Sequence, residues 1–220
     1  MLQDPVKLNA IIAHILQISS GLFWTLTYLL IIRRSYKDKS YGMPMIAICA
    51  NVSWEFIFSF VHPHPLPQLY IDYLWLLLDL GILVQFLRYG KKEFTEKLSG
   101  SLFLPIFLFT LAFSALLILL ISQEFNEYIG IYAAFGQNLV MSVLFIHLFL
   151  KREDAAGQSL YIALSKMIGT IFPSFLFYLY FPHSYLLLLL YAGIFILDLT
   201  YLLLLYFRLK ILIPHPWRRL

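Results

Sequence analysis

Three carboxylic acids lie deep inside apolar stretches of this sequence. Glu55, Asp79 and Asp198 each sit well within a run of mostly apolar residues that is long enough to form a membrane helix. An ionised carboxylate in hydrocarbon is costly, so an acid in such a place usually faces a protein cavity and marks a functional site. The chemistry to be explained is therefore that of several carboxyl groups in a membrane pocket.

Polar and aromatic side chains accompany each acid at helical spacing. Asn51 and Glu55 are four residues apart and share a helix face, and Trp54 adjoins Glu55. The other acids have similar companions: Asp72 and Trp75 beside Asp79, Tyr201 beside Asp198, and Asn138 in the fifth apolar stretch. If the helices surround a common space, this pattern predicts one mid-membrane chamber that all three acids face.

Seven stretches are long and apolar enough to cross a membrane as helices. They cover residues 9–32, 43–61, 69–87, 102–122, 128–150, 159–181 and 185–207. No tract between them resembles a linker, and a chain that is 61% hydrophobic has too little polar surface for a soluble domain. The sequence predicts an all-α membrane protein whose residues 1–220 form a single seven-helix bundle.

The basic residues predict the direction of the bundle. One alternating set of connections, together with the C-terminal tail, holds 14 of the 16 lysine and arginine residues. Connections rich in Lys and Arg stay in the cytoplasm. The N-terminus is therefore expected outside and the C-terminus in the cytoplasm, in a multi-pass protein of the plasma membrane.

Composition and charge also argue against several classes of protein. The net charge of +4 does not gather in one patch but falls at helix ends, where lipid headgroups explain it, so no nucleic-acid partner is expected. The single Cys49 excludes an intrachain disulfide and a cysteine-based metal cage. We expect no metal, no cofactor and no obligate protein partner.

Each acid also has a purely structural explanation. Asp79 could neutralise Lys166, which lies at a similar depth, roughly 10 Å from the side where the basic connections lie. Asp72 lies near the outer boundary, where a structural role or a place at the pocket rim is favoured. Glu55 and Asp198 have no obvious basic partner in the sequence, which favours a functional role for both.

A carboxyl group in an oily pocket suits one kind of chemistry in particular. Burial favours the neutral form of a carboxylic acid, and a neutral acid can protonate an alkene or an epoxide. Aromatic residues make up 18% of the chain, and inward-facing rings would stabilise the resulting carbocation while water is excluded. A second carboxyl or polar group would orient the acid or take up the final proton. These are the requirements for proton-initiated cyclisation of a polyprenyl chain.

Short motifs support this interpretation through a resemblance. The segment Ala50–Phe56, with Asn51, Trp54 and Glu55, is similar to the Asn-x-x-Trp-Glu-Phe element of the small membrane-integral terpene cyclases of meroterpenoid pathways, the pyripyropene and paspaline type. The segment Trp75–Ile82, followed by Arg88-Tyr89-Gly90, resembles the third helix of that family and its exit. Asp198 matches the position of its second acid. The likeness spans most of the chain.

The resemblance implies particular roles for the acids. It assigns proton donation to Glu55 with assistance from Asp198, and it carries Asp79 over as a pocket residue only. Together with the helical spacing described above, it gives Asn51, Trp54, Asp72, Trp75, Asn138 and Tyr201 as the other residues expected to bind substrate. No Asp-Asp-x-x-Asp motif is present, which disfavours chemistry that starts from a magnesium-bound diphosphate. The expected partner is a lipid-soluble prenylated or isoprenoid substrate in the bilayer, with its head group open, and we expect a bacterial member of the family.

Other classes of membrane protein fit the sequence less well. A small seven-helix proton-coupled transporter could use Asp79 and Asp198 as proton relays. Such carriers repeat a Pro-Gln element within their helices, whereas the single pair here, Pro67-Gln68, falls in a connection. A retinal receptor needs a lysine in the last helix, and this one has none before Lys210. A purely structural subunit would not explain three deep acids.

Overall fold

The computed structural model describes residues 5–96 and 98–219, and seven α-helices run through this part of the chain. They are α1 (Ala10–Asp38), α2 (Met45–Phe56), α3 (Gln68–Thr95), α4 (Phe103–Glu124), α5 (Ile131–Lys151), α6 (Leu160–Tyr180) and α7 (Tyr185–Leu212). Short π or 3₁₀ turns lie at Ile57–Val61, Gly100–Leu102 and Pro216–Arg218. The prediction of an all-helical protein with seven helices is confirmed.

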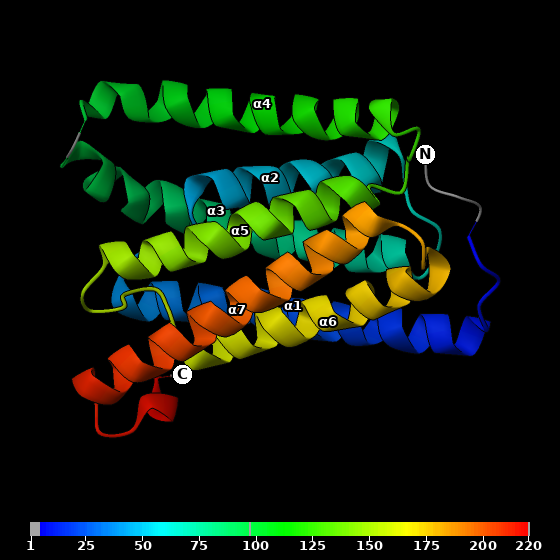
Figure 1. Ribbon diagram of the computed structural model, residues 1–220. Coiled ribbons are helices and arrows are strands. Elements are labelled where there is room, and N and C mark those ends of the chain that lie inside the picture. The colour runs from blue at the N-terminus through cyan, green and yellow to red at the C-terminus, as the bar shows by residue number, and fades with distance from the viewer. Residues whose placement is uncertain (1–4, 97, 220) are drawn as a thin grey trace.

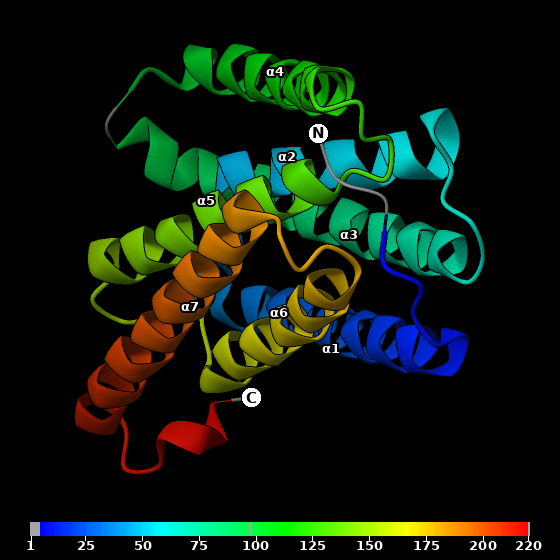
Figure 2. The same ribbon diagram turned by 45° about the vertical axis from the view of Figure 1, so that its right-hand side comes forward.

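The helices form a bundle in which α2 lies next to α4 (Figures 1 and 2). Helix α2 packs against α3, α4 and α5, while α1 packs against α6 and α3, and α7 against α5 and α6. Both views place α4 at one edge and the α1–α6 pair at the opposite edge. We call the end where α1, α3, α5 and α7 finish the basic end, and the other the N-terminal end.

Six of the helices are long and apolar enough to span a membrane, whereas the second stretch forms a shorter apolar helix, Met45–Val61. The expectation of seven full-length spans is therefore corrected to six candidate spans. Pro44 directly precedes α2, and Pro63 follows the π turn, so the chain around α2 cannot continue the helix in either direction. The π turn begins two residues after Glu55, and π turns within helices are frequent at functional sites.

Large apolar side chains cover the outward faces of the helices. Leu77 on α3, Phe109 on α4 and Leu189 on α7 are each more than 60% exposed. A water-soluble protein rarely leaves so wide an apolar surface uncovered. The exposed faces are therefore the ones that meet lipid in a multi-span membrane protein.

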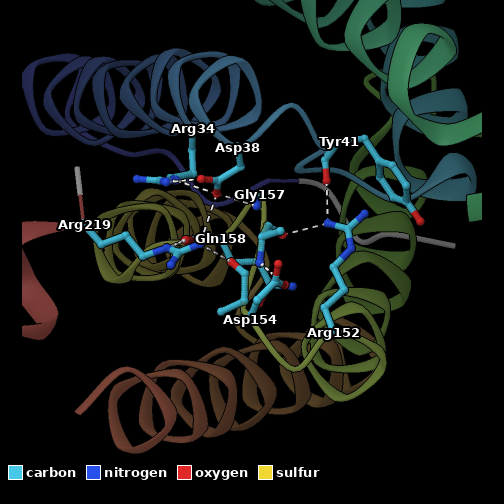
Figure 3. Close-up of polar contacts among 10 residues, drawn as sticks. Arg34, Asp38, Tyr41, Arg152, Asp154, Gly157, Gln158 and Arg219 are labelled. Atoms are coloured by element: carbon cyan, nitrogen blue, oxygen red, sulfur yellow. Dashed lines mark hydrogen bonds and ion pairs between the residues drawn. The ribbon is translucent and has the colours of Figure 1, made fainter. Parts of the chain in front are cut away.

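At the basic end, Asp38 joins three separate segments of the chain (Figure 3). Its carboxylate forms an ion pair with Arg34 one turn earlier and accepts a hydrogen bond from the Gly157 backbone N–H at 2.8 Å. The guanidinium of Arg219 also donates to Asp38, at 3.1 Å. These contacts tie the connection between α5 and α6 to the end of α1 and to the C-terminal segment.

Arg152 fixes the same connection from its other side (Figure 3). Its guanidinium donates to the backbone carbonyls of Tyr41 and Ala156, each at 2.7 Å, and lies 4.1 Å above the Tyr41 ring. It also pairs with Glu93 near the end of α3. The basic end is thus closed by a network of ionic contacts.

Beneath this network lies a layer of fully buried apolar side chains, which we call the apolar plug: Ile31, Met43, Ile48, Phe145, Phe149 and Ile162. They come from α1, α5, α6, the start of α2 and the segment before it. The plug fills the bundle between the basic end and the middle of the helices.

Candidate active site

A large cavity of about 550 Å³ occupies the half of the bundle toward the N-terminal end. Pro5, Leu8, Leu66 and Phe181 line it at that end, and Tyr28, Glu55 and Met141 line it farther inside. Its volume lies in the range of ordinary small-molecule sites, and its wall is mainly apolar with a few polar groups. We call this space the large cavity.

Glu55 lies in the wall of the large cavity and is 2% exposed. Its Oε1 accepts a hydrogen bond of 3.1 Å from the Tyr28 hydroxyl, which itself accepts one of 2.7 Å from the Asn51 side-chain amide. Within the described residues, Oε2 has no hydrogen-bond partner. One oxygen of the acid is therefore held by Tyr28, while the other is buried without a hydrogen-bond partner among the described residues.

Asp79 is the closest acidic companion of Glu55. It is fully buried on α3, and its carboxyl group lies within interaction range of the Asn51 amide and of the Glu55 carboxyl group. No protein donor in the described chain satisfies either of its oxygens. Two buried carboxyl groups that face each other without a nearby cation are most stable when they share a proton.

Aromatic rings form much of the cavity wall. Trp24, Tyr28 and Trp75 follow one another edge to face, with ring centroids 5.7 and 6.3 Å apart. Trp54 lines the cavity too, and its indole N–H donates to the Gly130 carbonyl at 3.0 Å. Gly130 has φ of 71°, and a Cβ there would lie 2.7 Å from the Trp54 Nε1, so this contact requires glycine.

A proline in α6 shapes the wall next to α1. Pro173 lines the large cavity, and because proline has no N–H it leaves the Gly169 carbonyl without its helical donor. The Ser20 hydroxyl of α1 donates to that carbonyl at 3.1 Å. Gly169 also lets Trp24 approach closely, since a Cβ would lie 3.0 Å from the indole ring.

Asp198 is placed differently from the expectation. Its Oδ1 pairs with the Lys166 ammonium at 2.7 Å, and these side chains are 2% and 1% exposed. The expectation that Asp198 has no basic partner is wrong, and so is the alternative in which Lys166 neutralises Asp79. The similar depths of Lys166 and Asp79 suggested that these two side chains pair. Lys166 lies on α6, however, and α6 packs against α7 and α1 rather than against α3, which carries Asp79.

Asp198 also faces a second space. It lines a small cavity of about 410 Å³ between α6 and α7, which we call the small cavity, and it is not among the residues that line the large one. Glu55 lines only the large cavity. The expectation that the three acids face one chamber is therefore wrong: Glu55 lines the large cavity, Asp79 lies beside Glu55 without lining it, and Asp198 lines the small cavity.

The other predicted binding residues divide in the same way. Asn51, Trp54, Trp75 and Asn138 line the large cavity. Tyr201 is buried against Phe145 and does not line it. Four of the predicted substrate-binding residues are thus brought to one surface, while Asp72, Asp79 and Tyr201 lie behind it.

Asp72 is fully buried and has a structural partner at the N-terminal end. The His64 ring bonds to its Oδ2 at 2.7 Å, and the Gln68 amide donates to its Oδ1 at 2.7 Å. The other His64 nitrogen lies 2.9 Å from the Ile129 carbonyl, which joins the connection before α3 to the one before α5. Burial lowers the pKa of His64, but its bond to Asp72 and the charges of Asp72 and Glu127 outweigh this and raise it above its ordinary value.

This raised pKa predicts how stability depends on pH. A charged His64 stabilises the fold fully below its unfolded pKa of about 6.5, and the contribution is lost as the pH rises through the higher folded value. The melting temperature in detergent should therefore fall as the pH rises above about 6.5. His64→Gln should melt lower at pH 6 and lose most of that dependence, and an equal pH slope in both proteins would contradict the assignment.

Several residues of the site were not predicted from the sequence. Tyr28, Trp24 and His64 line the large cavity, yet nothing in the sequence singled them out as part of it. A usable signal for the first two existed, because Trp24 and Tyr28 are four residues apart and lie on one helix face.

Together, the fold and this site define a membrane-spanning helical bundle with a buried acid in an aromatic cavity, and comparison with known proteins gives its family. The sequence profile of the Pyr4-like transmembrane terpene cyclases matches residues 3–210. The chain belongs to this family, and the resemblance inferred from Ala50–Phe56, Trp75–Ile82 and Asp198 is confirmed.

Individual relatives agree with the family match. The Pyr4-family terpene cyclase mfmH of Annulohypoxylon moriforme is 32% identical over 178 residues, which cover 76% of this chain and 72% of the relative. Asnovolin H synthase nvfL of Aspergillus novofumigatus is 29% identical (73% and 68% covered), and terpene cyclase penB of Penicillium crustosum is 27% identical (83% and 79% covered). No solved structure matches the chain.

These relatives favour an enzyme that cyclises terpenoids over the proton-coupled transporter. All three are fungal, so they lend no support to a bacterial origin, which stays a prediction.

Proposed function

We propose that this protein cyclises a polyprenyl chain by protonating an alkene or an epoxide inside the large cavity, with Glu55 as the acid and without a metal. The observation that carries the proposal is the Glu55 carboxyl group, which is buried in an aromatic cavity and has one oxygen held by Tyr28 and the other without a protein partner. Such a group is a proton donor shielded from water.

The proposed reaction balances without a further reagent. The proton leaves Glu55 Oε2 for the terminal alkene carbon or the epoxide oxygen, and the π electrons of the next double bond form the new carbon–carbon bond. Loss of a proton from the last carbocation regenerates the acid, and the Glu55–Asp79 pair is the acceptor we propose. The product is an isomer of the substrate with fewer carbon–carbon double bonds.

The wall of the cavity suits the intermediates of this reaction. The faces of aromatic rings attract cations, and Trp24, Tyr28 and Trp75 form a continuous edge-to-face series beside Glu55. Asn51 and Asn138 add polar groups for orienting the chain. The substrate proposed is a lipid-soluble prenylated or isoprenoid compound that enters from the bilayer.

The proposal also covers orientation and location. We infer that the basic end faces the cytoplasm, because it carries most of the lysine and arginine residues, and that the N-terminal end with the cavity mouth lies outside. Residues 1–220 would then act as one domain in the plasma membrane.

Metal independence gives a direct prediction. Because the donor is a carboxyl group, cyclisation should continue within about twofold when excess chelator is added to membranes that contain the protein. No group of three or more His, Cys, Asp or Glu side chains that could hold a metal occurs among the described residues. Loss of activity that added Mg²⁺ restores would contradict the proposal.

The defining experiment incubates such membranes with a panel of prenylated compounds and their terminal epoxides. Products of unchanged mass with fewer double bonds, absent from membranes without the protein, are the expected result. If no compound in the panel is converted while the folded protein is present, the proposed function fails.

A further inference from the structure

A buried ion pair lies directly behind one wall of the large cavity. The Lys166 ammonium donates to Asp198 Oδ1 at 2.7 Å and to the Ser142 hydroxyl at 2.8 Å. On its other side it lies 5.8 Å from the centroid of the Trp24 ring, which lines the cavity. The Trp24 ring therefore borders both this positive charge and the space in which substrate would react.

The carboxylate of the pair lies on the side away from the large cavity. Asp198 lines the small cavity between α6 and α7, and its second oxygen has no hydrogen-bond partner in the part of the chain that the structure describes. Asp198 is bonded to Lys166 and does not line the large cavity. This geometry does not suit a direct proton donor to a substrate next to Glu55.

We propose that Asp198 is a positioning residue that acts through Lys166: it neutralises the ammonium group behind Trp24 so that a carbocation can form in the large cavity. This rests on the function proposed above. Two like charges repel strongly in a medium of low dielectric constant, and a carboxylate at hydrogen-bond distance cancels most of the ammonium field. Without Asp198, a protonated Lys166 would present an uncompensated positive charge to the reacting cation.

The pair also has a second role that any test must separate from the first. Lys166 joins α6 to Ser142 of α5 and to Asp198 of α7, so a variant could lose activity through loss of folded protein alone. Removing one partner of a buried ion pair is strongly destabilising, whereas replacing both by uncharged groups of similar size is often tolerated. The double replacement is therefore the informative variant.

The test measures equilibrium binding of two probes to purified protein in detergent. One is a prenyl trimethylammonium compound, whose fixed positive charge imitates the carbocation, and the other is its uncharged tert-butyl counterpart of the same shape. Asp198→Asn should bind the ammonium probe about tenfold more weakly or worse, as expected for two unit charges roughly 10 Å apart at moderate dielectric constant. It should bind the neutral probe as the wild type does.

The double variant Asp198→Asn with Lys166→Met should restore binding of the ammonium probe. It should also restore most of the cyclisation activity that Asp198→Asn loses, measured on a substrate that the wild type cyclises. Ser142→Ala is the matched control, because it removes the other hydrogen bond of Lys166 without changing any charge. Melting temperature and gel filtration report folding in each case.

Four results would overturn the inference. They are normal ammonium binding by Asp198→Asn, equal weakening of both probes, a folded double variant that stays inactive, and a double variant that does not fold. The third would make Asp198 a proton donor in its own right. Since probe binding does not require turnover, these outcomes are distinct from failure of the proposed function, which would appear as a wild-type protein that converts no substrate.

Discussion

Glu55→Gln should abolish cyclisation and leave a folded protein in the membrane. Glutamine keeps the size of the side chain and an oxygen that can accept from the Tyr28 hydroxyl, but it carries no acidic proton. Loss of the general acid should lower the rate by at least about 10³-fold. The measurement is product formation per folded protein, with folding followed by melting temperature in detergent.

A matched variant makes this result specific. Glu124 lies exposed at the end of α4, so Glu124→Gln makes the same chemical change outside the cavity and should leave the rate unchanged. Full activity of Glu55→Gln would remove Glu55 from the role of acid. Equal losses in the two variants would point to a general effect of the substitution on the protein.

The second large effect is expected at Asp79. In Asp79→Asn the amide can donate a hydrogen bond to Glu55, which favours the carboxylate over the acid, so a smaller fraction of the protein carries the reactive proton. The rate at neutral pH should fall about hundredfold and recover partly as the pH is lowered. A profile of rate against pH for wild type and variant measures this directly.

Asp72→Asn provides the comparison for Asp79. Asp72 lies two turns before Asp79 on α3, and the oxygens of Asp72 bond to His64 and Gln68 rather than facing Glu55. We expect it to lower the melting temperature but to keep the shape of the pH profile. If Asp79→Asn showed the same profile as wild type, the carboxyl of Asp79 would have no part in holding the proton.

The sequence predicted the helices well because their cause is local. Long apolar runs between charged connections require helices in a bilayer, whatever their neighbours. The second stretch was the exception, since length and hydropathy gave 43–61 as a span although Pro44 and Pro63 limit the helix that forms there.

The sequence could not predict which acid forms the buried ion pair with Lys166. Depth along a helix follows from counting residues, and Asp79, Lys166 and Asp198 come out at nearly the same depth, roughly 10–14 Å from the basic end. Which acid meets the lysine depends on how the helices are arranged and rotated about their axes. Packing of α6 against α7 decides it, and no spacing within a single helix carries that information.

The apolar plug and the ionic network above it have a consequence for turnover. Because they close the basic end, the proposed linear substrate would have to enter, and the proposed ring product leave, by a route that does not pass through that end. A fused ring system is rigid, so it cannot change its conformation to fit a curved path as its flexible linear precursor can. We therefore expect departure of the finished product, rather than bond formation, to set the pace of each catalytic cycle.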